Sequence, residues 1–510
     1  MFPSILFRGE IRQPLRRHAP DFFRDLNLEQ LIDPIIRWNQ KTDLSGLYYT
    51  PLERREDICY RLEITKDLMH RQNWKRFKAF AQEIFELASC QEAAVEDFES
   101  GNPLLRNYLL CGHVFELGTR YCSAIRSFLG DVPGMELRSE GLGRTVQAME
   151  NLCSSDFYVR MRQTQESLRA GFDREQYCML IRDGSIRLTK YDGEEDLSSR
   201  IQAVFRKFSR EDSRDYRRTF SETPHVEAVE AGVLQCLAEL YPELFRQLEN
   251  YVTEFIMFTD PGLLQLCREL QFYLSWLKAV RKLEEKGLPF CCPETTGSRL
   301  FCNEFYDIVL ADKTGGEVVK NDFYLEEPER ILVVTGPNQG GKTTFGRAIG
   351  QIHYLASLGL CVPGSSACLL LPNRILTHFE REESLTTLNG KLQDDLLRLR
   401  RLLEQADEHS LVIINEIFAS TVLEDALRLS SHMMDALIRK KSMGVVITFL
   451  DALSEYSPET VSMMSMVDPG HPETRTFRVI RKPADGRAYA MTVAERHGLT
   501  RDQILRRIAP

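Results

Sequence analysis

An apolar run followed by a glycine-rich loop has the residue types that bind phosphate groups. The run covers Ile331 to Val334, and a helix-compatible stretch follows the loop through Leu358. The loop residues, which match GxxxxGK[ST], are Gly336, Pro337, Asn338, Gln339, Gly340, Gly341, Lys342 and Thr343. This pattern between a strand and a helix is typical of nucleotide binding, because glycine permits backbone conformations that turn successive N–H groups toward phosphate oxygens. Lys342 would bridge the β- and γ-phosphates of ATP, and the Thr343 hydroxyl would bind Mg²⁺.

Two further apolar runs end in polar residues that could act on the same nucleotide. Leu411 to Ile414 is followed by Asn415 and Glu416. A carboxylate at the carboxyl end of a neighbouring strand can accept a proton from an attacking water, so Glu416 is the candidate general base. The alternative is a solvated residue after a buried strand. Thr448 lies near the end of the third run, GVVITF, and is either a sensor of the γ-phosphate or an ordinary strand residue.

The apolar spacing divides the chain into a helical part and an α/β part. Helical periodicity dominates residues 1–290. The exception is Cys178 to Lys190, where two short runs flank Asp183-Gly184, a dipeptide that favours a tight hairpin turn. Short β-prone runs then alternate with helices, which predicts an α/β P-loop domain over residues 291–510. We therefore expect a mixed fold, with a helical domain that carries a small hairpin near residues 178–190 and an α/β domain after it.

Length and composition indicate a soluble protein with more than one domain. The 510 residues exceed what one core usually holds, and 43% of them are hydrophobic. The thirteen cysteines form no CxxC pair, which favours buried reduced thiols over a zinc site. No apolar run approaches the ~18 residues of a membrane span, so we expect a cytoplasmic protein with no membrane association.

The negative net charge of −9 requires that any nucleic-acid surface be local. The most basic stretch is Arg200 to Arg218. The cations in it that could neutralise DNA phosphates are Arg206, Lys207, Arg210, Arg214, Arg217 and Arg218. The alternative is a solvated helix face whose aromatic residues point to the core.

The order of these motifs resembles that of the MutS family, the mismatch-repair branch of the ABC-type ATPases. In the second half of the chain the resemblance rests on TGPNQGGKTT, GLCVPGSSA, LVIINEIFAST, GVVITF and PADGRAYAMTVAERHGL. In the first half, FRDLNLEQLID and YYTPLERREDICYR resemble the start of the family's helical core, and LFCNEFYDIVL through NDFYL resembles the entry into its ATPase domain. The resemblance implies a helical core and lever followed by an ABC-type ATPase domain.

The same resemblance implies an ATPase that works as a dimer, with both sites near the subunit interface. The residues that would line the phosphates are Asn338, Gly341, Lys342, Thr343 and Thr344. Glu416 would polarise the attacking water, and Thr421 and Asp425 match positions just beyond the acidic strand. The resemblance thus implies ATP and Mg²⁺ as ligands, a homodimer and an association with DNA.

Several positions depart from the family's pattern. Asn415 stands where the family usually has Asp, so an acceptor oxygen for a Mg²⁺-bound water is kept but a negative charge beside the cation is lost. Phe418-Ala419-Ser420 replaces a glycine-rich turn, and Phe449 stands where a His is common. Residues 388–395 read LNGKLQDD where a Ser-Thr-Phe signature would cross the dimer interface. We therefore expect weaker Mg²⁺ binding, together with either slow ATP hydrolysis or a differently built dimer interface.

The resemblance to the helical core begins at Phe23, so the mismatch-recognition and connector domains are expected to be absent. Mismatch specificity is accordingly not expected. Two functions remain open. The first is a MutS-like ATPase that holds or releases DNA in repair or recombination. The second is an ATP-gated dimer that recruits protein partners and has no DNA role.

Overall fold

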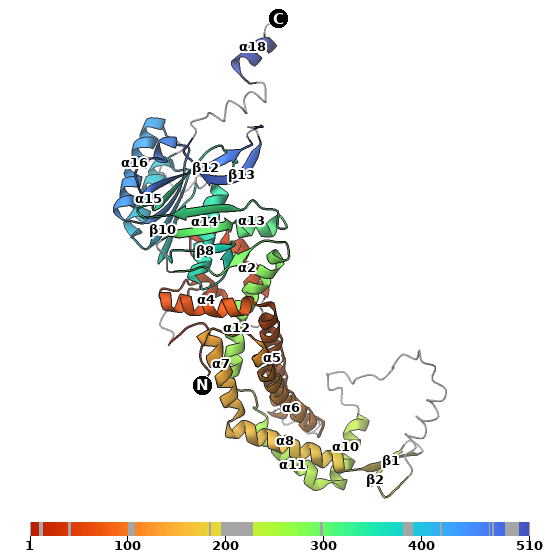
Figure 1. The fold of residues 1–510 in the computed structure, drawn as a ribbon. Coiled ribbons are helices and arrows are strands. Elements are labelled where there is room, and N and C mark those ends of the chain that lie inside the picture. Colours follow the sequence, from red (N-terminus) through yellow and green to blue (C-terminus); the bar gives the residue numbers. More distant parts are fainter. Residues whose placement is uncertain are drawn as a thin grey trace. The chain divides into compact units, whose positions relative to one another are not determined.

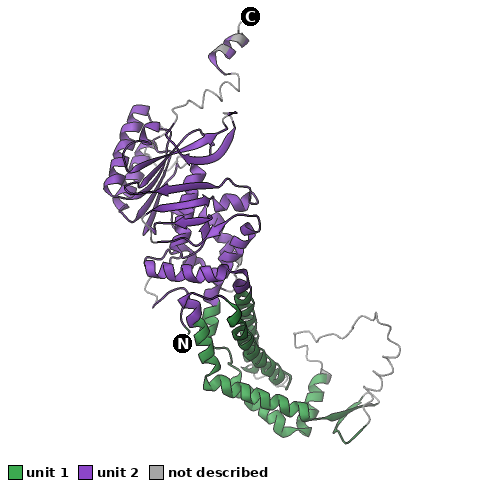
Figure 2. Ribbon diagram, viewed as in Figure 1, with its two compact units in different colours: residues 1–2, 76–135, 145–267 green, residues 3–75, 136–144, 268–510 purple. Residues whose placement is uncertain are grey.

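The computed structural model (Figure 1) describes residues 2–9, 14–38, 42–99, 108–182, 185–194, 228–295, 299–380, 391–418, 421–468, 470–471, 474–484 and 499–508. The chain forms two compact units (Figure 2). Unit 1 comprises residues 1–2, 76–135 and 145–267, and unit 2 comprises residues 3–75, 136–144 and 268–510. Because compactness alone does not define a domain that folds by itself, the division at residues 290/291 stays a prediction.

Long helices make up most of unit 1. They are α5 (Arg71–Glu99), α6 (Tyr108–Asp131), α7 (Glu140–Cys153), α8 (Asp156–Arg174), α10 (Ala228–Leu240) and α11 (Pro242–Phe255), with the short 3₁₀ turn η1 (Val132–Gly134) after α6. The first residues of α5 and α7 belong to unit 2, as does most of α12 (Pro261–Glu284), of which only residues 261–267 lie in unit 1. Helix α11 begins with Pro242, at a position where proline costs no hydrogen bond, and buries Phe245, Leu248 and Val252 along one face. It packs against α6 and α8, where the Gln165 amide donates to the Tyr251 hydroxyl at 2.7 Å. These two buried polar groups are therefore paired with each other.

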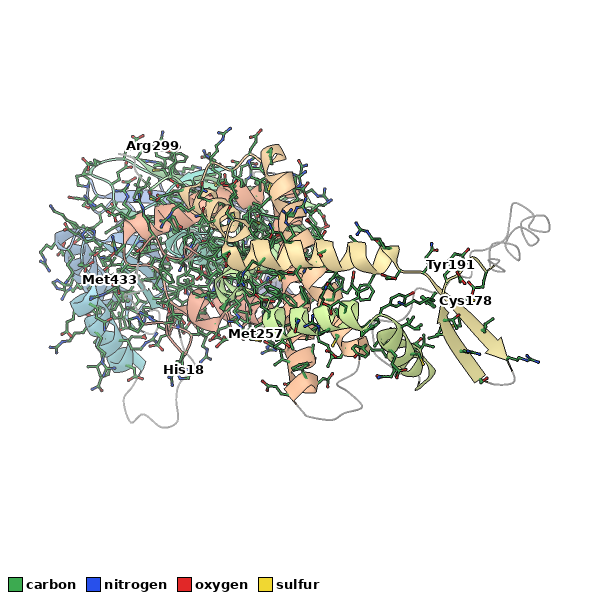
Figure 3. The ribbon with its side chains drawn as sticks, turned by 90° about the horizontal axis from the view of Figure 1, so that it is seen from below. His18, Cys178, Tyr191, Met257, Arg299 and Met433 are labelled. Atoms are coloured by element: carbon green, nitrogen blue, oxygen red, sulfur yellow. The ribbon has the colours of Figure 1, made fainter. Side chains whose placement is uncertain are left out.

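A two-stranded hairpin also belongs to unit 1. Strands β1 (Tyr177–Arg182) and β2 (Ser185–Lys190) pair antiparallel, from Tyr177 opposite Lys190 to Arg182 opposite Ser185. Figure 3 labels Cys178 in β1 and Tyr191 just after β2. The expected turn residues, Asp183 and Gly184, lie outside the described residues.

A six-stranded mixed sheet is the centre of unit 2. Its strands, in spatial order, are β13 (Arg475–Arg481), β12 (Thr460–Val467), β6 (Ile331–Thr335), β11 (Met443–Ile447), β10 (Ser410–Asn415) and β9 (Arg374–His378). All neighbours pair parallel except β12 and β13, which pair antiparallel. Every residue of β6, β10 and β11 is buried, as expected for parallel strands covered on both faces.

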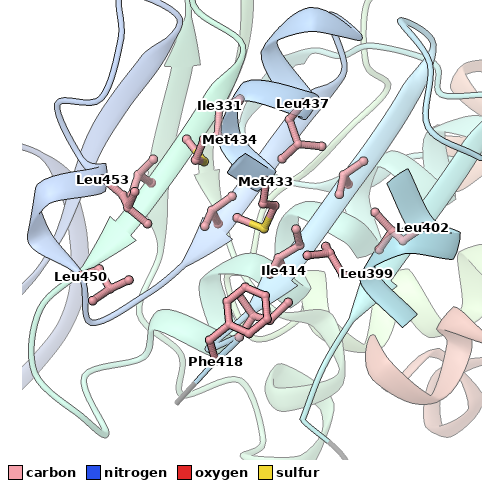
Figure 4. Close-up of a cluster of buried hydrophobic side chains, with 14 of the residues drawn as sticks. Ile331, Leu399, Leu402, Ile414, Phe418, Met433, Met434, Leu437, Leu450 and Leu453 are labelled. Carbon is pink, nitrogen blue, oxygen red and sulfur yellow. The ribbon is translucent and has the colours of Figure 1, made fainter. Parts of the chain in front are cut away.

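Alternating residues of the central strands face two helical layers. On one face, Val412, Ile414 and Val446 join side chains of α15 (Lys391–Gln405) and α16 (Leu423–Arg439) in one apolar cluster, shown in Figure 4. On the other face, Ile413 and Ile447 lie against glycines of α14 (Lys342–Ser357). The sheet edge formed by the carboxyl ends of β6 and β10 is thereby held between two packed layers.

Smaller elements surround this sheet. Strands β4 (Leu300–Phe305), β5 (Asn321–Leu325) and β8 (Ser366–Cys368) form an antiparallel sheet, and β3 (Phe290–Cys291) pairs with β7 (Val362–Pro363). Helix α13 (Ile308–Lys313) lies between β4 and β5 in the sequence, the 3₁₀ turn η2 (Asp451–Leu453) follows β11, and α18 (Arg501–Ile508) ends the described chain. No helix among the described residues is long and apolar enough to span a bilayer.

The first helices of the chain belong to unit 2. They are α1 (Phe22–Asp25), α2 (Leu28–Trp38), α3 (Ser45–Tyr49) and α4 (Arg55–Met69). In α4 the fully buried Arg61 donates from Nε to the Leu6 carbonyl at 2.7 Å and from Nη1 to the Leu358 carbonyl at 3.2 Å. The rings of Phe7 and Phe272 lie 4.9 and 5.0 Å from its guanidinium. These partners offset the loss of water around the cation, although burial lowers the pKa of Arg61.

The structure confirms the predicted mixed fold at the level of helical parts combined with an α/β part. The arrangement of the helices as a core and lever stays a prediction. Unit 2, which holds the α/β part, also contains residues 3–75. The helical periodicity of that segment does not reveal that it belongs there.

Candidate nucleotide-binding site

The glycine-rich loop joins the end of β6 to the first residue of α14. Gly336 and Gly341 have φ angles of +110° and +89°, and Gln339 has a φ of +60°. A Cβ atom on Gly336 would lie 2.8 Å from the Ser465 carbonyl oxygen. Both the positive φ and this close approach require glycine. The sequence-predicted loop therefore has the strand, turn and helix geometry that its motif demands.

Ser465 in β12 holds this loop against the sheet by a hydrogen bond. Its buried hydroxyl donates to the Gly340 carbonyl at 2.6 Å, and a Cβ atom on Gly340 would meet the same hydroxyl at 2.3 Å. Sequence reasoning missed Ser465, because it lies 125 positions from its partner and belongs to no local motif. The parallel pairing of its strand with β6 brings it there, and that pairing is not visible in the sequence.

The Lys342 ammonium lies inside the loop. Its Nζ donates to the Gly336 carbonyl at 2.8 Å, the Pro337 carbonyl at 3.2 Å and Asn338 Oδ1 at 3.1 Å. Glu416 Oε1 lies 3.7 Å from the same nitrogen. Burial lowers the pKa of Lys342, and the Glu416 carboxylate opposes that shift. A cation surrounded by oxygens at this depth is placed where anionic phosphate oxygens could replace them.

Thr343 and Asn415 meet across the edge of the sheet. The Thr343 hydroxyl donates to Asn415 Oδ1 at 2.9 Å. The two residues come from the start of α14 and the end of β10, which lie side by side because α14 packs on that strand. Two oxygens at this spacing fit one side of a magnesium shell that phosphate oxygens and water would complete. Among the described residues, no group of three or more His, Cys, Asp or Glu could hold a metal ion by itself.

Glu416 follows directly at the same edge and has a strained backbone. Its φ is +51°, its amide donates to the Ile447 carbonyl at 2.9 Å, and its side chain is 32% exposed. Phe418 also has a positive φ, +61°, and its ring is fully buried in the cluster of Figure 4. Residues other than glycine rarely adopt such angles. Burial of the Phe418 ring therefore stabilises a turn in which the Glu416 carboxylate can reach Lys342.

A cavity of about 510 Å³ opens beside the loop, a size that suits a nucleotide. The loop and helix residues that line it are Gln339, Gly340, Gly341, Lys342, Thr343, Thr344, Phe345 and Ala348, together with Glu416. The opposite wall comes from the β4–β5 connection, including Phe305, Asp307 and Val319, and from Phe477 in β13. No motif in the sequence marks this wall. The positive φ of Phe477, +57°, likewise has no signal in the residue pattern.

Gln351, a residue of α14, forms hydrogen bonds with that wall and with the amino-terminal segment of the chain. Its Nε2 donates to Asp307 Oδ1 at 3.0 Å and to the Leu26 carbonyl at 2.9 Å, and its Oε1 accepts from the Ile308 amide at 3.1 Å. Asp307 caps α13 through the amides of Val309 and Leu310. Burial raises the pKa of Asp307. The cavity wall is thus fixed by hydrogen bonds rather than by apolar packing alone.

Other predicted residues are not gathered at this cavity. Thr448 is buried at the end of β11, where its amide donates to the Val334 carbonyl and its hydroxyl accepts from the Leu450 amide, and it does not line the cavity. Its role as a γ-phosphate sensor stays a prediction. The basic residues Arg206, Lys207, Arg210, Arg214, Arg217 and Arg218 lie outside the described residues, as do 381–390, 419–420 and 485–498.

Comparisons with known proteins agree with the motif order. Residues 332–508 match the family model of MutS domain V. The chain is 33% identical over 193 residues to Endonuclease MutS2 of Thermus thermophilus, covering 38% of this chain and 26% of that protein. It is 24% identical over 449 residues to DNA mismatch repair protein MutS of Lactobacillus delbrueckii subsp. bulgaricus, covering 82% of this chain and 49% of that protein. The chain thus spans half or less of the length of these curated relatives.

Gly336→Ala should destabilise the fold more than the same change at a glycine with open space. Both Gly336 and Gly287 have positive φ angles, but a Cβ atom on Gly287 would meet nothing within 4 Å. We expect Gly287→Ala to lower the free energy of unfolding by about 1 kcal/mol, and Gly336→Ala to lower it by at least about 1 kcal/mol more. Chemical denaturation of the two variants measures the difference. Equal losses would contradict the close approach to Ser465.

Proposed function

We propose, from the premise that this chain belongs to the MutS family, that it binds ATP at the glycine-rich loop and hydrolyses it. The observation that supports this most is the buried Lys342 ammonium, held by loop oxygens at 2.8 to 3.2 Å. Burying an ammonium ion costs free energy unless oxygens replace its water. A triphosphate would supply such oxygens with full negative charge, so the loop favours a polyphosphate over a neutral ligand.

Six residues at the loop and at the end of β10 would have defined parts. Gly340, Gly341 and Thr344 would present backbone amides to the phosphates, and Lys342 would exchange its loop carbonyls for β- and γ-phosphate oxygens. The Thr343 hydroxyl and Asn415 Oδ1, already 2.9 Å apart, would hold a magnesium ion directly or through water. That ion would neutralise charge on the phosphates when bound.

Glu416 would then accept the proton of the attacking water. Its carboxylate is partly exposed, lines the cavity and follows the strand that carries Asn415. In this structure Glu416 Oε1 lies 3.7 Å from Lys342 Nζ. When Lys342 moves toward the phosphate oxygens, its ion pair with Glu416 would break. The Glu416 carboxylate would then be available to the attacking water, so nucleotide binding would free the general base.

We further propose that the chain associates with DNA and dimerises through its ATPase part. The support comes from two relatives, one named as an endonuclease and one as a DNA mismatch repair protein, and from the basic stretch at residues 200–218. The rival is an ATP-gated dimer that recruits proteins, and the net charge of −9 favours it. Specificity for mismatches forms no part of the proposal.

Glu416→Gln should retain ATP binding and lose hydrolysis. The amide keeps the size of the side chain but cannot accept a proton, so we expect turnover to fall by about 100-fold or more. Lys342→Ala should instead abolish ATP binding, because the loop loses its ammonium. Calorimetric ATP titration and phosphate release, measured on both variants, separate the two roles. Unchanged turnover in Glu416→Gln would exclude Glu416 as the base, and unchanged ATP affinity in Lys342→Ala would refute the nucleotide site.

Asn415→Asp should lower the Mg²⁺ concentration needed for half-maximal hydrolysis by about tenfold. The carboxylate adds one negative charge beside the Thr343 hydroxyl. Asn303→Asp, the same chemical change on the exposed surface of β4, is the control for the altered net charge. A Mg²⁺ titration that shifts equally in both variants, or in neither, would refute magnesium binding at Asn415.

DNA association is tested by gel retardation of duplex, branched and single-stranded DNA at low salt, with and without ATP·Mg²⁺. We expect retardation that weakens steeply as salt rises, and a further loss in Arg210→Glu/Arg214→Glu. Arg54→Glu/Arg400→Glu, two exposed sites elsewhere, is the charge-matched control. Absence of retardation under every condition would refute the DNA role, and partners that survive nuclease treatment in pull-down experiments would then favour the rival.

A further inference from the structure

A second cavity lies in unit 2, away from the glycine-rich loop. Its volume is about 770 Å³. The residues that line it are 16–22 and Asp25 before and within α1, Pro51, residues 372–378 around β9, and residues in the last turns of α14 and α15. All of these segments belong to unit 2. The size is within the range of pockets that hold a nucleotide-sized ligand.

Arginine side chains dominate this cavity. The arginines are Arg16, Arg17, Arg374, Arg398 and Arg401, and two histidines, His18 and His378, also line it. Five arginines against two lining carboxylates, Asp21 and Asp25, leave a local excess of three positive charges with both histidines neutral. In a chain whose net charge is −9, such an excess in one concave site needs an explanation.

Two carboxylates that contact residues lining the cavity are already engaged. Asp25 Oδ2 accepts from the Thr377 hydroxyl at 2.7 Å, and Asp395 Oδ1 lies 3.3 Å from Nε2 of the buried His378. No described carboxylate lies within ion-pair distance of Arg401 or Arg17. His18, labelled in Figure 3, lies in the same exposed stretch as Arg17. Arg17 and Arg401 therefore contribute positive charge to the cavity that no ion pair with a described carboxylate cancels.

Two of the guanidinium groups are held in place by backbone carbonyls. Arg374 donates from Nη1 to the Gln405 carbonyl at 2.9 Å, and Arg398 donates from Nη2 to the Phe379 carbonyl at 3.1 Å. Arg398 and Arg401 are three positions apart on α15 and so share one face of that helix. Fixed guanidinium forks lose little freedom when they bind an anion with several oxygens.

We propose that this cavity binds the phosphate groups of a nucleotide-sized ligand through Arg374, Arg398 and Arg401, with Arg16 and Arg17 closing over it. The phosphate would come from a free nucleotide or from the phosphorylated end of a nucleic-acid strand. Phosphate oxygens match the planar fork of arginine, and the lining side chains Phe22 and Pro20 offer apolar surface for the rest of the ligand.

This site is separate from the glycine-rich loop. Lys342 begins α14 and lines the first cavity, whereas Tyr354 and Ser357 end the same helix and line the second. Fifteen residues of helix correspond to roughly 22 Å at 1.5 Å per residue. One phosphate ligand cannot occupy both sites, so the second site can be tested after the first has been disabled.

The test uses the full chain carrying Lys342→Ala, which removes the loop ammonium. Calorimetry at low salt would measure binding of three probes: tripolyphosphate, ATP without Mg²⁺, and a 5′-phosphorylated oligothymidine with its unphosphorylated form as reference. Arg401→Glu is then compared with Arg400→Glu. Arg400 is the neighbouring residue of α15, is exposed, pairs with Glu404 at 2.9 Å and does not line the cavity. Thermal unfolding confirms that both variants are folded.

We expect saturable binding of at least one probe, weakened about tenfold or more by Arg401→Glu and by less than about twofold by Arg400→Glu. Preference for ATP would assign the site to a free nucleotide. Preference for the phosphorylated over the unphosphorylated oligothymidine would assign it to a strand end. No saturable binding of any probe, or equal weakening by both variants, would overturn the proposal. Because Lys342→Ala is present throughout, failure here leaves the proposed ATPase function untouched.

Discussion

The buried ammonium of Lys342 is the constraint on which the candidate site depends. A cation removed from water must be surrounded by oxygens, and here those oxygens come from Gly336, Pro337 and Asn338. The loop can bend around the ammonium because Gly336 and Gly341 adopt positive φ angles. Its position is then fixed from outside by Ser465, whose hydroxyl holds a loop carbonyl against the sheet.

Short-range patterns in the sequence predict the local parts of this candidate site. The glycine spacing, the buried strand before it and the polar residues Asn415 and Glu416 at the end of β10 all follow from short-range patterns, and the parallel order of β6, β11 and β10 brings Thr343 and Asn415 together. The far wall of the cavity was not predictable in this way. Ser465 and Phe477 reach the loop through the pairing of β12 with β6 and of β13 with β12, which no residue spacing encodes.

The amino-terminal segment shows the same limit for the fold as a whole. Its apolar periodicity predicts helices, and helices form, but periodicity does not say what a helix packs against. Arg61 is the clearest case, because a charged residue in a helix is expected at the surface. Here its guanidinium joins the Leu6 and Leu358 carbonyls, which are far apart in the sequence, and two aromatic rings complete its surroundings.

The side chain of Gln351 has a consequence for any attempt to divide the protein. Its one amide group forms hydrogen bonds with Asp307 and Ile308 in the cavity wall and also with the Leu26 carbonyl. A fragment cut near residue 290 would lose the Leu26 partner, together with the Leu26 side chain that lies against Gly350 in α14. The excised α/β portion would therefore present an uncovered apolar helix face and a half-paired amide, and its solubility and behaviour would misrepresent those of the intact chain.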